Sequence, residues 1–162
     1  MEYLMTYGWA ILIVIIVAAA LYALGVFNPV TTSSATGFPN FIVPAGGWQY
    51  VNVPGPPVTG TLTLQIRNAA GGNIAVTAVD VLDSSGVALA GTQCNSPNAA
   101  GALCSTGITM GPNAQQTFIV SAVPNVPTAS SSYSLRVKVT YDNTDSGLTG
   151  FSSVGTLTGT VG

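Results

Sequence analysis

The stretch SYSLRVKVTY, Ser132 to Tyr141, alternates polar and apolar residues without a break. One face carries hydroxyl and basic side chains, and the other carries the apolar residues Tyr133, Leu135, Val137, Val139 and Tyr141. A period of two is typical of a half-buried antiparallel strand. The stretch TLTLQIR, Thr61 to Arg67, has the same alternation, so at least two amphipathic strands are expected.

Weaker strand patterns and turn signals surround these two stretches. Inside Ile74–Leu82 the apolar phase changes between Ala78 and Val79, which predicts a β-bulge. Glycine-rich turns such as Gly71-Gly72-Asn73 separate the runs. Roughly seven short strands at this spacing favour an antiparallel, Ig-like β-sandwich with Greek-key connections. The weaker strand candidates are Trp48–Val53, Ile74–Leu82, Thr117–Val123 and Thr156–Val161.

An uncharged run, YLMTYGWAILIVIIVAAALYALGVF from Tyr3 to Phe27, precedes the β-rich part. Apolar residues run all round such a helix, which predicts burial in lipid or among other helices. Its length of roughly 38 Å exceeds a bilayer core of about 30 Å, and Asn28-Pro29 would end it. We therefore expect an α+β protein with a long N-terminal hydrophobic helix over residues 1–28, which spans the membrane before assembly. A polar linker over 29–37 and a β-sandwich head domain over 38–162 would follow.

The low charge content argues against several classes of function. Only 5% of the 162 residues are charged, against about 25% in a typical soluble domain. Three basic residues cannot neutralise the six to ten phosphates of a typical DNA interface, so no nucleic-acid partner is expected. The chain has no histidine and few acids, which argues against an enzyme, and we expect neither a cofactor nor a metal site.

The opening EYLMTYGWAIL, Glu2 to Leu12, followed by the Ile/Val/Ala run, resembles the start of archaeal type IV pilin-like proteins. The resemblance implies a major pilin, the structural subunit of a homopolymeric and adhesive cell-surface filament outside the cell. It also implies a precursor in the cytoplasmic membrane, and as partners a prepilin peptidase and an assembly ATPase with its membrane platform. No basic residue occurs before Arg67. Either a basic leader preceded Met1 and was removed, or the chain begins at Met1 with unusual topology signals.

Two other functions fit the same pattern. The chain could be a single-pass, membrane-anchored extracellular binding module with an adhesive sandwich. It could also be an archaellin, the subunit of a motility filament. Filaments in sheared cell-surface material would separate a polymer from an isolated anchor.

Particular helix residues are expected to pack in a filament core. Ala19 and Ala23, four residues apart, would let helices approach closely, although alanine is also simply a good helix former. The aromatic residues fit either a membrane interface or a helix bundle. Glu2 would be stabilised by the helix dipole or would pair with a neighbouring subunit's α-amino group. The expected core residues are Tyr3, Tyr7, Trp9, Ile11, Ile15, Ala19, Ala23 and Phe27.

Cys94 and Cys104 lie in a loop rich in Gly, Asn, Pro and Ser. Zinc is disfavoured because the chain has no histidine and only two cysteines. An oxidising compartment outside the cytoplasm favours a disulfide between them. The acidic pairs Asp80/Asp83 and Asp142/Asp145 could be read as catalytic acids or calcium ligands. Turn chemistry explains them better, because Asp readily bonds its own backbone in turns.

Overall fold

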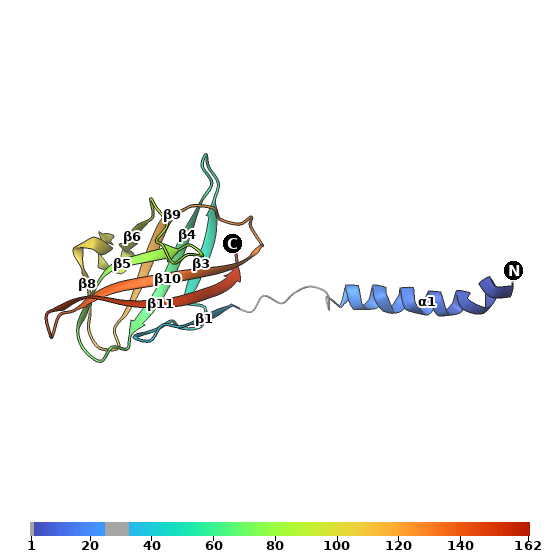
Figure 1. The fold of residues 1–162 in the computed structure, drawn as a ribbon, viewed down its shortest axis with the longest axis horizontal. Helices are drawn as coiled ribbons and strands as arrows, with labels where there is room; N and C mark the ends of the chain where they lie inside the picture. Colours follow the sequence, from blue (N-terminus) through green and yellow to red (C-terminus); the bar gives the residue numbers. More distant parts are fainter. Residues whose placement is uncertain (1, 25–32) are drawn as a thin grey trace. The chain divides into compact units, whose positions relative to one another are not determined.

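The structure is a computed structural model that describes residues 2–24 and 33–162, with helix side chains described from Tyr7 onward. Contacts divide the chain into two units, Met1–Val30 and Thr31–Gly162. The first unit contains the helix α1, Glu2–Ala23 (Figure 1). The second unit contains all eleven described strands.

Two antiparallel sheets make up the second unit, which we call the head. The first sheet has the order β1-β11-β10-β5-β8, and the second has the order β2-β4-β9-β6-β7 with β3 also paired to β4. The first sheet consists of β1 (Ser34–Thr36), β5 (Ile74–Leu82), β8 (Ile108–Met110), β10 (Ser132–Asn143) and β11 (Leu148–Thr160). The second consists of β2 (Phe41–Ile42), β3 (Trp48–Val53), β4 (Thr59–Asn68), β6 (Gln93–Ser96), β7 (Ala102–Leu103) and β9 (Gln115–Val123).

The hydrophobic core lies between the two sheets and gives the head the arrangement of a β-sandwich. Alternate residues of each long strand point inward, as Leu62, Leu64 and Ile66 do on β4. They meet the inward residues of the first sheet, among them Val137 and Val139 of β10. Each such side chain contributes about 1.5–3 kcal/mol relative to exposure. The head therefore has a core of its own.

The expected α+β class is wrong, because the described chain is mostly β. The two sheets cover each other's apolar faces, and every residue of the buried core cluster lies between Phe41 and Val161. The core therefore needs no helix. The α-helix is also shorter than expected: α1 ends at Ala23, and the Leu24 N–H closes its last turn on the Ala20 carbonyl at 2.9 Å. Phe27 lies outside the described residues.

Several strand predictions are confirmed, and others were missed. β3 and β5 have the expected bounds, and the expected bulge lies in β5, where the pairing with β10 skips Thr77. β11 begins at Leu148, well before the expected Thr156. Within the expected linker, residues 29–32 lie outside the described part, whereas Ser34–Thr36 pairs with β11 as an edge strand.

Candidate assembly helix and head surface

The helix α1 exposes large apolar side chains on every side. Seven consecutive residues, Ile11 to Val17, are all exposed, and they cover almost two turns. Trp9 is 66% exposed and Ile15 is 62% exposed. Tyr7, Ala19 and Ala23 are exposed too. This surface has no polar face with which to meet water.

The structure describes only some of the helix residues that were expected to pack in a filament core. The backbone of Glu2 and Tyr3 belongs to α1, but their side chains, like Phe27 and Met1, lie outside the described residues. The proposed role of the Glu2 carboxylate stays a prediction for that reason. No helix in residues 2–24 and 33–162 is long and apolar enough to cross a membrane.

The disulfide prediction is confirmed, because Cys94 and Cys104 are bonded to each other. Their Cα atoms lie 5.5 Å apart, at the usual spacing for a disulfide. The bond joins β6 to the short 3₁₀ helix η2, Cys104–Thr106. A second 3₁₀ helix, η1 (Pro97–Ala99), lies inside the closed loop. The bridge therefore secures an otherwise irregular loop at the edge of the second sheet.

Asp83 and Asp145 accept hydrogen bonds in turns, as expected, whereas Asp80 and Asp142 lie within the paired strands β5 and β10. Asp83 Oδ1 accepts hydrogen bonds from the Ser85 hydroxyl at 2.6 Å and from the backbone N–H groups of Ser85 and Val87 at 2.9 Å. These bonds, that of the Ser85 hydroxyl first, lower the pKa of Asp83. Within the described residues, no three His, Cys, Asp or Glu side chains come together as a metal site.

Tyr50 and Tyr133, which are both buried, have raised pKa values, in contrast to the lowered pKa of Asp83. Burial, with a smaller effect from Tyr133, raises the pKa of Tyr50 to about 12. The rings of Tyr50 and Tyr133 meet edge to face, with centroids 5.2 Å apart. Efficient proton transfer at neutral pH favours a group with a pKa near 7, and these shifts move the pKa values of Tyr50, Tyr133 and Asp83 away from it.

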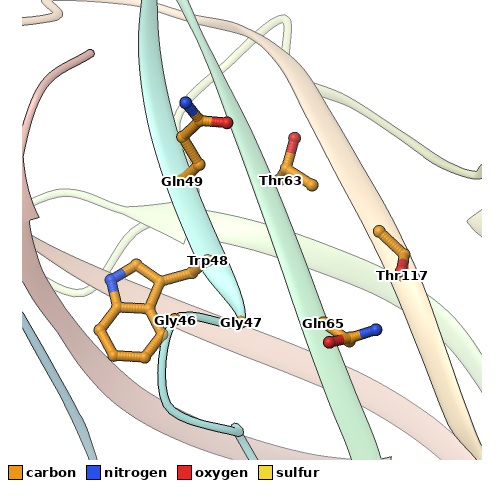
Figure 2. A pocket seen from close by; sticks show the side chains of 7 residues that line it. All are labelled: Gly46, Gly47, Trp48, Gln49, Thr63, Gln65 and Thr117. Carbon is orange, nitrogen blue, oxygen red and sulfur yellow. The ribbon is translucent and has the colours of Figure 1, made fainter.

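The outer face of the second sheet carries a shallow hollow of about 260 Å³. Figure 2 shows its side chains on three neighbouring strands, with Gln49 on β3, Thr63 and Gln65 on β4, and Thr117 on β9. The loop residues Gly46 and Gly47 and the first residue of β3, Trp48, complete the lining. All of these groups are neutral, so the hollow suits an uncharged, hydroxyl- or amide-bearing surface and offers no acid or base.

A second hollow, of about 310 Å³, lies at one end of the same outer face and was not predicted. It is lined by Ile42, Pro44, Arg67 and Gln115. The pairing register places Ile42 and Gln115 on either side of Arg67. No sequence signal marked this row, because β2 is only two residues long and has no readable period.

No protein family matches the chain, and no curated protein matches it.

Proposed function

We propose that this protein is a structural subunit of a homopolymeric cell-surface filament of the archaeal type IV pilus kind, and that it polymerises through α1. The observation that carries the proposal is the helix surface, apolar on every side from Ile11 to Val17. A helix with such a surface needs an apolar sheath. In a homopolymer, sister helices supply that sheath.

The energetic scale supports self-association through the helix. Burying a Leu- or Ile-sized side chain is worth about 1.5–3 kcal/mol relative to exposure. For the seven residues from Ile11 to Val17 this amounts to roughly 10–20 kcal/mol as an upper estimate. That range reaches or exceeds the net stability of a typical domain, about 5–15 kcal/mol. Leaving the helix uncovered would therefore cost as much as unfolding a domain.

The head supports the same proposal because it is a self-contained unit. Its core cluster comes entirely from residues after the helix, and its two sheets cover each other. A subunit of this kind folds its head independently and uses the helix for assembly alone. The disulfide fits a location outside the cytoplasm. We include adhesion in the proposal, because the neutral hollow around Gln49 and Gln65 suits contact with an uncharged surface.

Four forms of the chain test the proposal by negative-stain microscopy. The full chain should form filaments once solubilising detergent is removed. The head alone, residues 33–162, should remain a folded monomer. Ile15→Lys places a charge on the exposed apolar surface and should abolish filaments, whereas the matched control Ile15→Leu should assemble normally. Filaments built by the head alone would show that the helix is not the driver. A full chain that stays monomeric without detergent would overturn the proposal altogether.

A further inference from the structure

The hairpin between β3 and β4 ends in an apolar, proline-rich tip. Six consecutive residues, Val53 to Val58, are exposed, and their sequence is VPGPPV. Figure 1 shows this loop standing out from the sheets, beyond the labels β3 and β4. Val58 is 49% exposed, so an apolar side chain faces solvent at this surface position. We call Val53–Val58 the tip.

The tip has more backbone hydrogen-bond acceptors than donors. Pro54, Pro56 and Pro57 have no backbone N–H but keep their carbonyl oxygens. Within the described residues, no hydrogen bond involves residues 54–58. Proline rings also hold the backbone in a narrow range, so little freedom is lost on binding. A partner surface would therefore combine apolar contact with hydrogen-bond donors.

The hollow lined by Ile42, Pro44, Arg67 and Gln115 has this complementary chemistry. Ile42 is 43% exposed and supplies apolar area beside Pro44. Arg67 carries five N–H donors and Gln115 carries two. Neither side chain bonds to another described residue, so their donors are free for a ligand. We call this set the donor hollow.

The tip and the donor hollow lie at opposite ends of β4. The hairpin closes at the pair Val53 and Thr59, whereas Arg67 pairs with Ile42 near the other end of the strand. At about 3.3 Å per residue, Thr59 and Arg67 are roughly 26 Å apart along β4. The tip therefore cannot reach the donor hollow of its own head, and a contact between them joins two different molecules.

We propose that the tip of one head docks into the donor hollow of the next head in the filament. This inference rests on the proposed function and names the head contact that accompanies helix assembly. Two different surfaces at opposite ends make a head-to-tail contact, and a contact of this kind propagates as an open chain when it does not close into a ring. The proline carbonyls accept from Arg67 and Gln115, while Val58 and the proline rings cover Ile42 and Pro44.

Cysteine cross-linking in full-chain filaments tests the contact. Val58→Cys combined with Gln115→Cys puts one thiol on each surface, and the native disulfide leaves no other free thiol. Mild oxidation should give a ladder of dimers, trimers and longer species, because each chain then carries both halves of the bond. Val87→Cys with Gln115→Cys is the matched control, since Val87 is exposed but belongs to neither surface, and it should give no ladder.

A charge exchange gives a second, independent readout. In the Val58→Cys/Gln115→Cys background, Val53→Lys places a cation on the tip against Arg67 and should lower the head cross-link at least tenfold, and adding Arg67→Glu should restore it. Filaments that form normally but give no ladder with the Val58/Gln115 pair would overturn the head contact while leaving the proposed function intact. Absence of filaments from the unmodified chain would overturn the proposed function and the head contact with it.

Discussion

The Asp145 carboxylate holds Asn73 by two hydrogen bonds. Its Oδ2 accepts from the Asn73 backbone N–H at 2.7 Å, and its Oδ1 accepts from the Asn73 side-chain amide at 2.8 Å. The Thr144 N–H donates in return to the Asn73 carbonyl at 3.0 Å. These contacts join the β4–β5 turn to the β10–β11 turn. They stabilise the charged carboxylate, and so lower the pKa of Asp145 from its ordinary value of 3.8.

Acid stability should depend on this pair of residues. A carboxyl group with a lowered folded-state pKa stabilises the fold above the ordinary value of 3.8, and this contribution is lost as pH falls through the lowered pKa. Asp145→Asn should therefore make the unfolding temperature of the head fall less steeply below about pH 4. Asn73→Ala should have a smaller effect in the same direction, because it removes the side-chain donor but keeps the backbone N–H. An unchanged slope in both variants would contradict this prediction. Hydrogen bonds in another turn also lower the pKa of Asp83. Asp83 should therefore preserve part of the pH dependence of the unfolding temperature in both variants.

The Phe38 ring occupies the space that a side chain on Gly155 would need. Gly155 lies on an inward position of β11, where alternation calls for a side chain. Gly155→Val should destabilise the head by about 1–3 kcal/mol through overpacking, as measured by urea unfolding. Thr156→Val, one residue on and facing outward, is the matched control and should change stability by less than about 0.5 kcal/mol. Phe38→Leu should recover part of the loss in the Gly155→Val background, because the two side chains compete for one space.

Asn68 is a fully buried polar residue that ties three segments together. Its side-chain amide donates to the carbonyls of Gly72, Met110 and Gly111 at 2.8–3.2 Å, and its Oδ1 accepts from the Ala70 N–H at 2.9 Å. Asn68→Ala leaves buried groups without partners and should cost about 1–3 kcal/mol of unfolding free energy. Asn68→Asp, which keeps the shape but replaces the donor group by an acceptor facing three carbonyl oxygens, should cost at least as much. A variant as stable as the parent would show that water replaces these bonds at no cost.

The disulfide should contribute measurably to head stability. Closing a loop of ten residues in sequence separation is worth about 3 kcal/mol in the chain-entropy treatment. Cys94→Ser with Cys104→Ser should lower the unfolding free energy by about that amount, with the fold retained. Intact-mass analysis after alkylation without reductant should show no labelled thiol in the parent protein. Two labelled thiols in freshly prepared native protein would be inconsistent with the bond.

The sequence predicted the strands whose periodicity is carried by large apolar residues. β3 and β5 were located to the residue, because Trp48–Val53 and Ile74–Leu82 have the required residues and clear turn signals at their ends. β11 was predicted to begin only at Thr156 because the inward positions before it, Ser153 and Gly155, carry no large apolar side chain. The space at Gly155 is filled by the Phe38 ring, which comes from elsewhere in the chain. Such pairing has no local signature.

The class and the helix end were misjudged for a different reason. The uncharged run continues past Ala23 to Phe27, so the pattern predicts a helix that lasts until Asn28-Pro29. Gly25 was the available signal, since glycine commonly follows a helix end. The short strands β1, β2, β6, β7 and β8 have two to four residues each, too few to show a period. The disulfide could be predicted because it followed from two cysteines and the expected compartment alone.

The packing of α1 in the filament should depend on the small residues Ala19 and Ala23. Both are exposed and lie one turn apart on the same side of the helix. Helices approach to about 8–10 Å between axes, with the side chains at the contact deciding the distance. Replacing both alanines by leucine raises the apolar area and at the same time prevents close approach. Apolar area alone predicts stronger assembly of this variant, whereas close packing predicts weaker assembly.

We expect the double variant Ala19→Leu with Ala23→Leu to assemble poorly or to form wider filaments. The reason is that helices gain most from one another where small residues allow many short contacts. Sedimentation of detergent-free protein measures the assembled fraction, and electron microscopy measures the width. The matched control is Ile11→Leu with Ile15→Leu, which changes two residues at the same spacing and keeps their volume; it should assemble like the parent. Equal or stronger assembly of the alanine variant at unchanged width would show that apolar area, rather than close helix packing, holds the filament together.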